Sequence, residues 1–126
     1  MSEQAIREVI ERAYIEGIHL EQDEEKVRRG FHPEFRMLVR RGEEVLPVDS
    51  GTFLARVIDR RREDPAAFES ELSYEIEVLD RAETAAVARI DLSRSGVHQF
   101  TDYMLLYRFA DGWKIVSKAF HAYPRD

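Results

Sequence analysis

Residues 97–123 read VHQFTDYMLLYRFADGWKIVSKAFHAY, and this stretch decides the fold. Two long segments rich in aromatic and aliphatic side chains flank Asp111-Gly112, a dipeptide typical of the tight turn in a β-hairpin. We therefore expect two long antiparallel strands, His98–Phe109 and Trp113–Tyr123, joined by this turn.

The segment before this hairpin predicts two more strands. Apolar and polar side chains alternate over residues 72–78, which is typical of a strand with one buried face. A turn at Arg81-Ala82-Glu83 separates it from a further strand at Ala85–Leu92. Because connections this short join antiparallel strands, we expect residues 68–123 to form most of a curved antiparallel meander of about four long strands.

The N-terminal half is predicted to be mainly helical. Asp23 can cap a second helix, and Asp49 or Ser50 a third, because their side chains accept hydrogen bonds from free backbone N–H groups. Pro33 and Asp64-Pro65 are expected to end these helices. The first helix has apolar residues three and four positions apart, at Ile6, Val9, Ile10, Ala13, Tyr14, Gly17 and Ile18.

Between the second and third helices, Phe35–Arg40 predicts a strand and Val45–Val48 a short return strand. Helices followed by strands indicate an α+β fold, with about three helices packed on the curved sheet as one domain over residues 1–126. The second face of this sheet also carries apolar residues, such as Leu105 and Tyr107. We therefore expect a homodimer that associates through this face.

Composition excludes several classes of function. The formal net charge of −6 argues against a nucleic-acid partner, and the basic run Arg60-Arg61-Arg62 is followed at once by two acidic residues. The absence of cysteine excludes disulfides and thiolate chemistry. No apolar stretch reaches the roughly 20 residues of a membrane helix, and we find no signal peptide. We expect a cytoplasmic protein without a membrane partner.

Four motifs carry a resemblance to a known family: Tyr14-Ile15-Glu16-Gly17, Phe31-His32-Pro33, Thr101-Asp102-Tyr103 and DGWKIVSK at residues 111–118. In this order and spacing, the chain resembles the nuclear-transport-factor-2-like superfamily, and within it the branch called putative lumazine-binding proteins. The resemblance implies a cone-shaped, cystatin-like fold, often dimeric, with a pocket between sheet and helices. Members include isomerases, dehydratases and cyclases as well as binding-only proteins, so the resemblance assigns no reaction.

Asp102 and His121 are the candidate catalytic residues. If Asp111-Gly112 is the two-residue loop of the last hairpin, counting back along the ladder places Asp102 opposite His121 on one face. A carboxylate beside a histidine can orient the ring and raise its pKa, as a general base requires. In the structural alternative, Asp102 bonds a backbone group or pairs with Lys118.

The candidate ligand contacts are Tyr14, His32, Tyr74, Met104 and Lys118. Tyr14 points toward the core and can donate to a ligand oxygen, whereas His32 either caps the second helix or lines the cavity mouth. Lys118 lies at a dimer interface or enters the cavity, depending on the hairpin register. The four histidines lack metal-ligand spacing, and the chain has no phosphate loop, so we expect neither a metal nor a cofactor.

Three functions are compatible with these residues. The first is a protein that binds a small organic molecule in a cavity between sheet and helices, without catalysis. The second is a cofactor-independent isomerase or dehydratase that uses Asp102 and His121. The third is a non-catalytic dimerisation or interaction module that uses the outer face of the sheet. Two observations discriminate among the three functions: whether the fold has a pocket, and where Asp102 and His121 lie relative to it.

Overall fold

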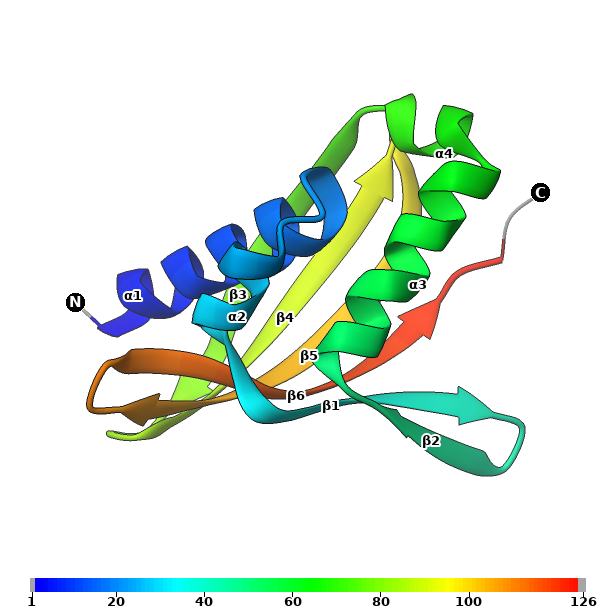
Figure 1. Ribbon diagram of the computed structural model, residues 1–126. Helices are drawn as coiled ribbons and strands as arrows, with labels where there is room; N and C mark the ends of the chain where they lie inside the picture. Colours follow the sequence, from blue (N-terminus) through cyan, green and yellow to red (C-terminus); the bar gives the residue numbers. More distant parts are fainter. Residues whose placement is uncertain (1, 125–126) are drawn as a thin grey trace.

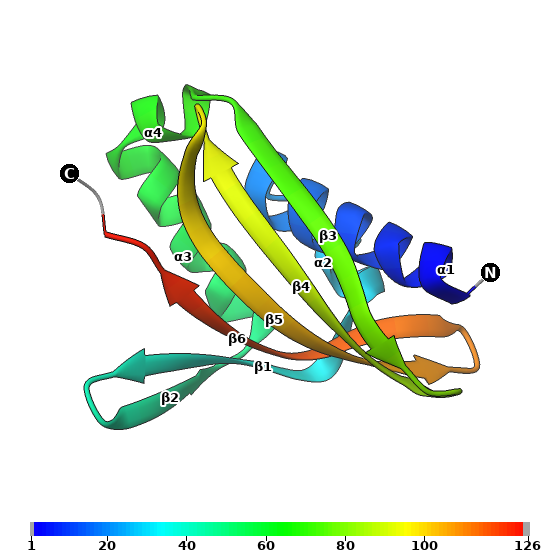
Figure 2. The same ribbon diagram turned by 180° about the vertical axis from the view of Figure 1, so that it is seen from behind.

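The computed structural model describes residues 2–124 and has two layers (Figure 1). A curved sheet of six strands forms one layer, and the helices lie across one of its faces, the inner face. Figure 2 shows the opposite, outer face, with the helices behind the sheet. The predicted α+β class is confirmed.

The sheet has the strand order β2-β1-β6-β5-β4-β3. Neighbouring strands are antiparallel except for β1 and β6, which run parallel. The meander β3–β4–β5–β6 confirms the four long strands predicted from the second half of the chain. The strands are β1 (Phe31–Arg41), β2 (Glu44–Val48), β3 (Leu72–Arg81), β4 (Ala85–Arg94), β5 (Val97–Phe109) and β6 (Gly112–Ala122).

Five helical segments lie on the inner face. They are α1 (Ser2–Val9), the π-helical segment η1 (Ile10–Leu20), α2 (Glu24–Gly30), α3 (Ser50–Glu63) and the short α4 (Pro65–Glu69), which was not predicted. In η1 the N–H of Glu21 donates to the carbonyl of Glu16, five residues earlier, at 2.8 Å. Such wider π-type turns are frequent at functional sites. The predicted apolar stripe is buried, including Ile10, Tyr14 and Ile18. No helix within residues 2–124 combines the length and apolar character of a membrane span.

The predicted helix starts are confirmed at two aspartates. Asp23 accepts from the N–H groups of Glu25 and Lys26, and Asp49 rather than Ser50 caps α3. The predicted end of the second helix at Pro33 is wrong, because α2 ends at Gly30. Gly30 lies so close to η1 that a Cβ here would be 2.3 Å from the Cβ of Ala13.

The register of the β5–β6 hairpin differs from the predicted one. Its two-residue loop is Ala110-Asp111, so that Phe109 pairs with Gly112. Further along, β6 contains one extra residue, Val116, between the partners of Leu106 and Leu105. This β-bulge reverses the faces of all side chains beyond it, because side chains alternate along a strand.

The bulge determines what the inner face carries. Asp102 pairs with Phe120, and Met104 pairs with Lys118, all on the inner face. His121 pairs with Thr101 and is exposed on the outer face. The fold therefore places a carboxylate and an ammonium group, instead of a carboxylate and an imidazole, beneath the helices.

Candidate functional site

Tyr14, Asp102 and Lys118 form a buried polar cluster between η1 and the inner face of the sheet. They come from η1, β5 and β6 and are 1%, 0% and 4% exposed. Tyr14 donates its hydroxyl proton to Oδ2 of Asp102, and Lys118 Nζ donates to the Tyr14 hydroxyl at 3.0 Å. Lys118 Nζ also lies 3.5 Å from Oδ1 of Asp102, an ion contact. We call these three residues the inner cluster.

Aromatic rings surround the ammonium group of Lys118. Its Nζ lies 4.5 Å from the ring centre of Phe53, 4.8 Å from that of Tyr14 and 4.9 Å from that of Phe120. Rings at these distances attract a cation through their negative faces. The aromatic side chains therefore replace part of the hydration that Lys118 loses on burial.

Burial shifts the pKa of all three groups of the inner cluster. It raises the pKa of Asp102, and this effect outweighs the nearby charge of Lys118 and the hydrogen bond from Tyr14. It lowers the pKa of Lys118, outweighing the attraction of Asp102. The pKa of Tyr14 is raised well above its ordinary value by burial and by Asp102. The pKa values of Asp102 and Lys118 are thus shifted toward each other, which is typical of groups that exchange a proton.

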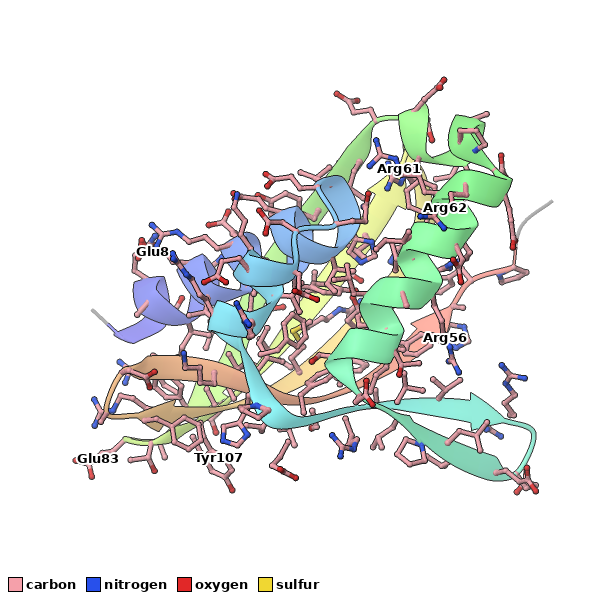
Figure 3. The ribbon with its side chains drawn as sticks, in the orientation of Figure 1. Glu8, Arg56, Arg61, Arg62, Glu83 and Tyr107 are labelled. Atoms are coloured by element: carbon pink, nitrogen blue, oxygen red, sulfur yellow. The ribbon has the colours of Figure 1, made fainter. Side chains whose placement is uncertain are left out.

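A pocket of about 360 Å³ opens beside the inner cluster, between α3 and the sheet. Aromatic and aliphatic side chains form its walls, and charged residues of α3 form its rim; Figure 3 shows one of them, Arg56. This volume lies in the range of small-molecule sites. The lining residues are Tyr14, His19, Met37, Val39, Phe53, Arg56, Asp59, Arg60, Glu63, Phe100, Lys118 and Phe120.

His19 lies where this pocket meets a second hollow of about 590 Å³, which extends toward α4 and β4. Its Nε2 atom is buried and has no hydrogen-bond partner among residues 2–124. Burial, together with the charges of Lys118 and Arg94, lowers the pKa of His19 well below 6.5, so the ring is neutral. A buried polar atom without a partner costs about 1–3 kcal/mol, and a ligand can supply the missing bond.

The predicted pairing of Asp102 with His121 is wrong. His121 lies on the outer face, with its ring 4.7 Å from that of Tyr123. The physical reason is the β-bulge at Val116, which turns His121 outward and Lys118 inward. An acid–base mechanism that uses Asp102 and His121 together therefore has no geometric basis.

The other candidate residues are spread over the fold. Tyr14 and Lys118 line the 360 Å³ pocket, and their predicted role as ligand contacts stays a prediction. Met104 is fully buried in the core and does not line the pocket. Tyr74 lies at a separate hollow, where its hydroxyl donates to Glu11 at 3.0 Å.

His32 belongs to β1, where it neither caps the second helix nor lines the pocket. Its ring stacks on that of Phe109 at 4.9 Å, and its Nδ1 accepts from the N–H of Glu34. Apart from Tyr14 and Lys118, no lining residue was among the predicted ligand contacts, and His19, Phe100 and Phe120 are examples of those that were missed. The i, i+2 spacing of Lys118 and Phe120 already placed these two on one face.

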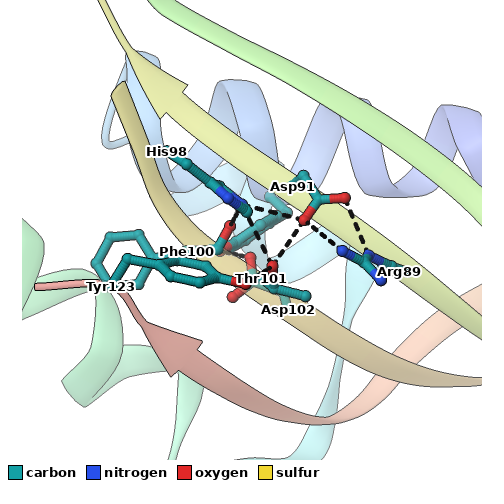
Figure 4. Close-up of polar contacts among 8 residues, drawn as sticks. Arg89, Asp91, His98, Phe100, Thr101, Asp102 and Tyr123 are labelled. Atoms are coloured by element: carbon teal, nitrogen blue, oxygen red, sulfur yellow. Dashed lines mark hydrogen bonds and ion pairs between the residues drawn. The ribbon is translucent and has the colours of Figure 1, made fainter. Parts of the chain in front are cut away.

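A second polar cluster lies on the outer face (Figure 4). Asp91 accepts from the guanidinium of Arg89 and from the hydroxyl of Thr101, and His98 Nε2 lies 3.1 Å from the same carboxylate. The Thr101 hydroxyl is also 2.9 Å from that of Tyr123. Asp91 and Thr101 both contact the same ring nitrogen of His98, so the histidine does not relay a proton between them. We call these five residues the outer cluster.

Within residues 2–124, no group of three or more histidine, aspartate or glutamate side chains is placed to hold a metal ion. The buried end of the pocket offers the inner cluster and His19, and its rim offers Arg56, Asp59, Arg60 and Glu63. The inner cluster and His19 supply one carboxyl group, one amino group, one phenol and one neutral imidazole.

Comparisons with known proteins identify the family of this chain. Residues 1–121 match the family described as Putative lumazine-binding. A solved NTF2-like protein of unknown function from Shewanella baltica OS155 has 26% identity, with 98% of this chain and 94% of that chain covered and a TM-score of 0.75. No curated protein matches the chain.

Two further structures support the fold alone. An NTF2-like protein of unknown function from Silicibacter pomeroyi DSS-3 has 20% identity and a TM-score of 0.73, and the match covers 95% of this chain and 94% of that chain. A protein with a cystatin-like fold from Caulobacter vibrioides has 14% identity and a TM-score of 0.69, and the match covers 99% of this chain and 92% of that chain. The chain belongs to the Putative lumazine-binding family of NTF2-like proteins.

Proposed function

We propose that this protein binds a small organic molecule in the 360 Å³ pocket beside α3. The observation that carries the proposal is Lys118, a buried amino group that lines this pocket among aromatic rings. Lys118 Nζ donates one hydrogen bond, to Tyr14, and even a neutral amino group has a second N–H donor. The remaining donor is available to a ligand oxygen.

The lining favours a planar ligand with one polar group. Rings of Phe53, Phe100 and Phe120 offer flat apolar contacts, and the inner cluster offers the polar contact. The family description, which names a heterocyclic ligand, agrees with a molecule of this kind. The charged rim on α3 keeps the opening in contact with water.

Blocking the pocket tests the proposal. Val39 of β1 lines the pocket, whereas its neighbour Arg40 is exposed. In Val39→Trp the indole fills the space of a ligand, and in Arg40→Trp the same side chain projects into solvent. Native mass spectrometry of protein purified from the cells that make it should find a bound molecule in the wild type and in Arg40→Trp, but not in Val39→Trp. A bare chain in all three, or a ligand retained in Val39→Trp, would contradict the proposal.

We further propose that two copies associate through the outer face. Tyr103, Leu105 and Tyr107 project from β5 on this face and are 43%, 52% and 52% exposed. Figure 3 shows Tyr107 directed away from the helices. Such a row of apolar side chains on a sheet is typical of a surface that a partner covers. Light scattering should give the mass of a dimer for the wild type and of a monomer for Leu105→Arg; a monomeric wild type would contradict this.

The enzymatic alternative requires different residues from those predicted. With His121 on the outer face, the buried acid–base groups beside the pocket, within the part of the chain that the structure describes, are those of the inner cluster and His19. Tyr14 already donates its proton to Asp102, so the group that faces a ligand directly is Lys118. An activity of this pocket would therefore be based on an amine.

A further inference from the structure

We infer that Lys118 binds a carbonyl compound covalently, as an imine, and that the natural ligand is an aldehyde or ketone with a planar apolar body. This inference rests on the proposed small-molecule function and specifies the chemistry of the same pocket. An imine forms when an unprotonated amine meets a carbonyl carbon where acid–base groups move protons and little water reverses the reaction.

The surroundings of Lys118 meet these requirements. Its amino group lines the pocket, yet the residue is only 4% exposed, so competing water is largely excluded. Tyr14 and Asp102 touch its Nζ at 3.0 and 3.5 Å, close enough to exchange protons with it. The aromatic rings of Phe53 and Phe120 leave an apolar space for the body of the ligand.

The choice of lysine at this position is itself informative. The chain has only three lysines among 19 basic residues, so arginine supplies most of its positive charge. Lys26 and Lys114 lie in ion pairs nearer the surface, with Glu16 and Asp111 respectively. Among residues 2–124 the one buried cation is a lysine, which can lose its proton, unlike arginine.

Burial also favours the neutral forms of Lys118 and Asp102, which the reaction requires. The pKa of Lys118 is lowered and that of Asp102 is raised, in both cases chiefly by burial. The groups that face Lys118 are Tyr14 and His19 from η1, Asp102 from β5, and Arg60 from α3. A neutral amine beside a protonated carboxyl group is the form from which the reaction starts.

The reaction balances with the groups present. The nitrogen of neutral Lys118 bonds to the carbonyl carbon, and the carbonyl oxygen takes the proton of Asp102, with Tyr14 bonded to the same carboxylate. The nitrogen then returns one proton to Asp102, and the new hydroxyl group takes this proton and leaves as water. The product is a protonated imine on Lys118 beside the Asp102 carboxylate, and no oxidant or reductant is consumed.

Reductive trapping tests the inference. The probe is 2-naphthaldehyde, offered to the wild-type chain at pH 7 with sodium cyanoborohydride, which reduces an imine to a stable secondary amine. Peptide mass spectrometry then locates the adduct on the three lysines. We expect labelling of Lys118 to exceed that of Lys26 by about tenfold or more, because each unit of pKa difference changes the neutral amine fraction about tenfold. It should also exceed that of Lys114, which does not line the pocket.

Two variants and a matched compound complete the experiment. Lys114→Arg should keep the adduct on Lys118, and Lys118→Arg should lose it. Equal labelling of all three lysines, or no adduct on Lys118, overturns the inference. The alcohol 2-naphthalenemethanol cannot form an imine, so its effect on melting temperature reports on the pocket alone. If it stabilises the wild type and Arg40→Trp but not Val39→Trp, the proposed binding function stands even when the imine fails.

Discussion

Asp91 and Asp102 occupy adjacent positions of the β4–β5 ladder, but they lie on opposite faces of the sheet. Asp91 pairs with Thr101, and Asp102 pairs with Ile90. On the outer face, partial burial raises the pKa of Asp91, but hydrogen bonds from Arg89 and Thr101 outweigh it and lower that pKa. On the inner face, burial outweighs every favourable contact and raises the pKa of Asp102.

The difference shows that environment, not residue type, separates a structural carboxylate from one suited to chemistry. The outer cluster is partly exposed and the Asp91 carboxylate is paired, so Asp91 keeps its ordinary ionised form. The inner cluster is dry and its acid and base compete for one proton. Groups held in a costly state by the surrounding fold are found at functional sites.

The largest expected effect comes from breaking the inner cluster. Lys118→Met should lower the free energy of unfolding by about 3 kcal/mol, because it leaves the Asp102 carboxylate buried without its cation. The double variant Lys118→Met with Asp102→Leu should recover most of this loss, because an apolar pair needs no compensating charge. Urea unfolding of the single and double variants measures both values.

The recovery is the decisive part of that experiment. If the double variant is less stable than Lys118→Met alone, the inner cluster stabilises the fold as a network and is not held at a cost in stability. The contrast between the two faces would then be lost.

His19 should make stability depend on pH. Its folded pKa is lowered well below 6.5, chiefly by burial, so the unfolded chain binds more protons in this window. Stability from this group is therefore present above pH 6.5 and is lost as the pH falls toward the folded pKa. Between pH 7 and pH 5 the loss should reach about 2 kcal/mol.

His19→Phe should remove this acid-side loss while keeping a ring beside Tyr14. His121→Phe is the matched control, since His121 is exposed on the outer face. Urea midpoints at pH 5, 6 and 7 compare the variants with the wild type. If the urea midpoint of His19→Phe changes with pH as much as that of the wild type, another group causes the pH dependence.

The smallest effect is expected on the outer face. Asp91→Asn should lower the free energy of unfolding by about 1 kcal/mol, because the carboxylate is partly exposed and its partners can form hydrogen bonds with water instead. The cost should shrink in 1 M salt, which screens surface ion pairs. Denaturant unfolding at low and high salt checks this, and a loss as large as that of Lys118→Met would remove the distinction between the clusters.

The sequence predicted the architecture well because periodicity and turn residues are local. Alternation defined the meander, and Asp23 and Asp49 marked helix starts that the structure confirms. The second helix ends earlier than predicted because Phe31 is already extended and pairs with Ile115 of β6, a contact between distant segments that no local pattern contains. The short helix α4 begins at Pro65, which is interpreted from the sequence only as the end of the preceding helix.

The site was less predictable, for a related reason. The exchange of His121 for Lys118 on the inner face results from one unpaired residue, Val116, which suits a regular strand as well as a bulge. The aromatic lining depends on how α3 docks over β6, which brings Phe53 next to Lys118. Both features depend on tertiary structure. The sequence therefore shows which residue types are present, but it does not show that they lie together in one pocket.

The central claim is that burial makes Lys118 a weak base poised for a ligand, in contrast to the surface lysines. The most direct test follows the Cε signals of ¹³C-labelled lysine by NMR while the pH is raised. Lys118 should lose its proton before Lys26, because burial lowers the pKa of Lys118 and hydrogen bonds to Glu16 and Glu21 raise the pKa of Lys26. If Lys118 titrates together with Lys26 or after it, the account of the inner cluster is wrong.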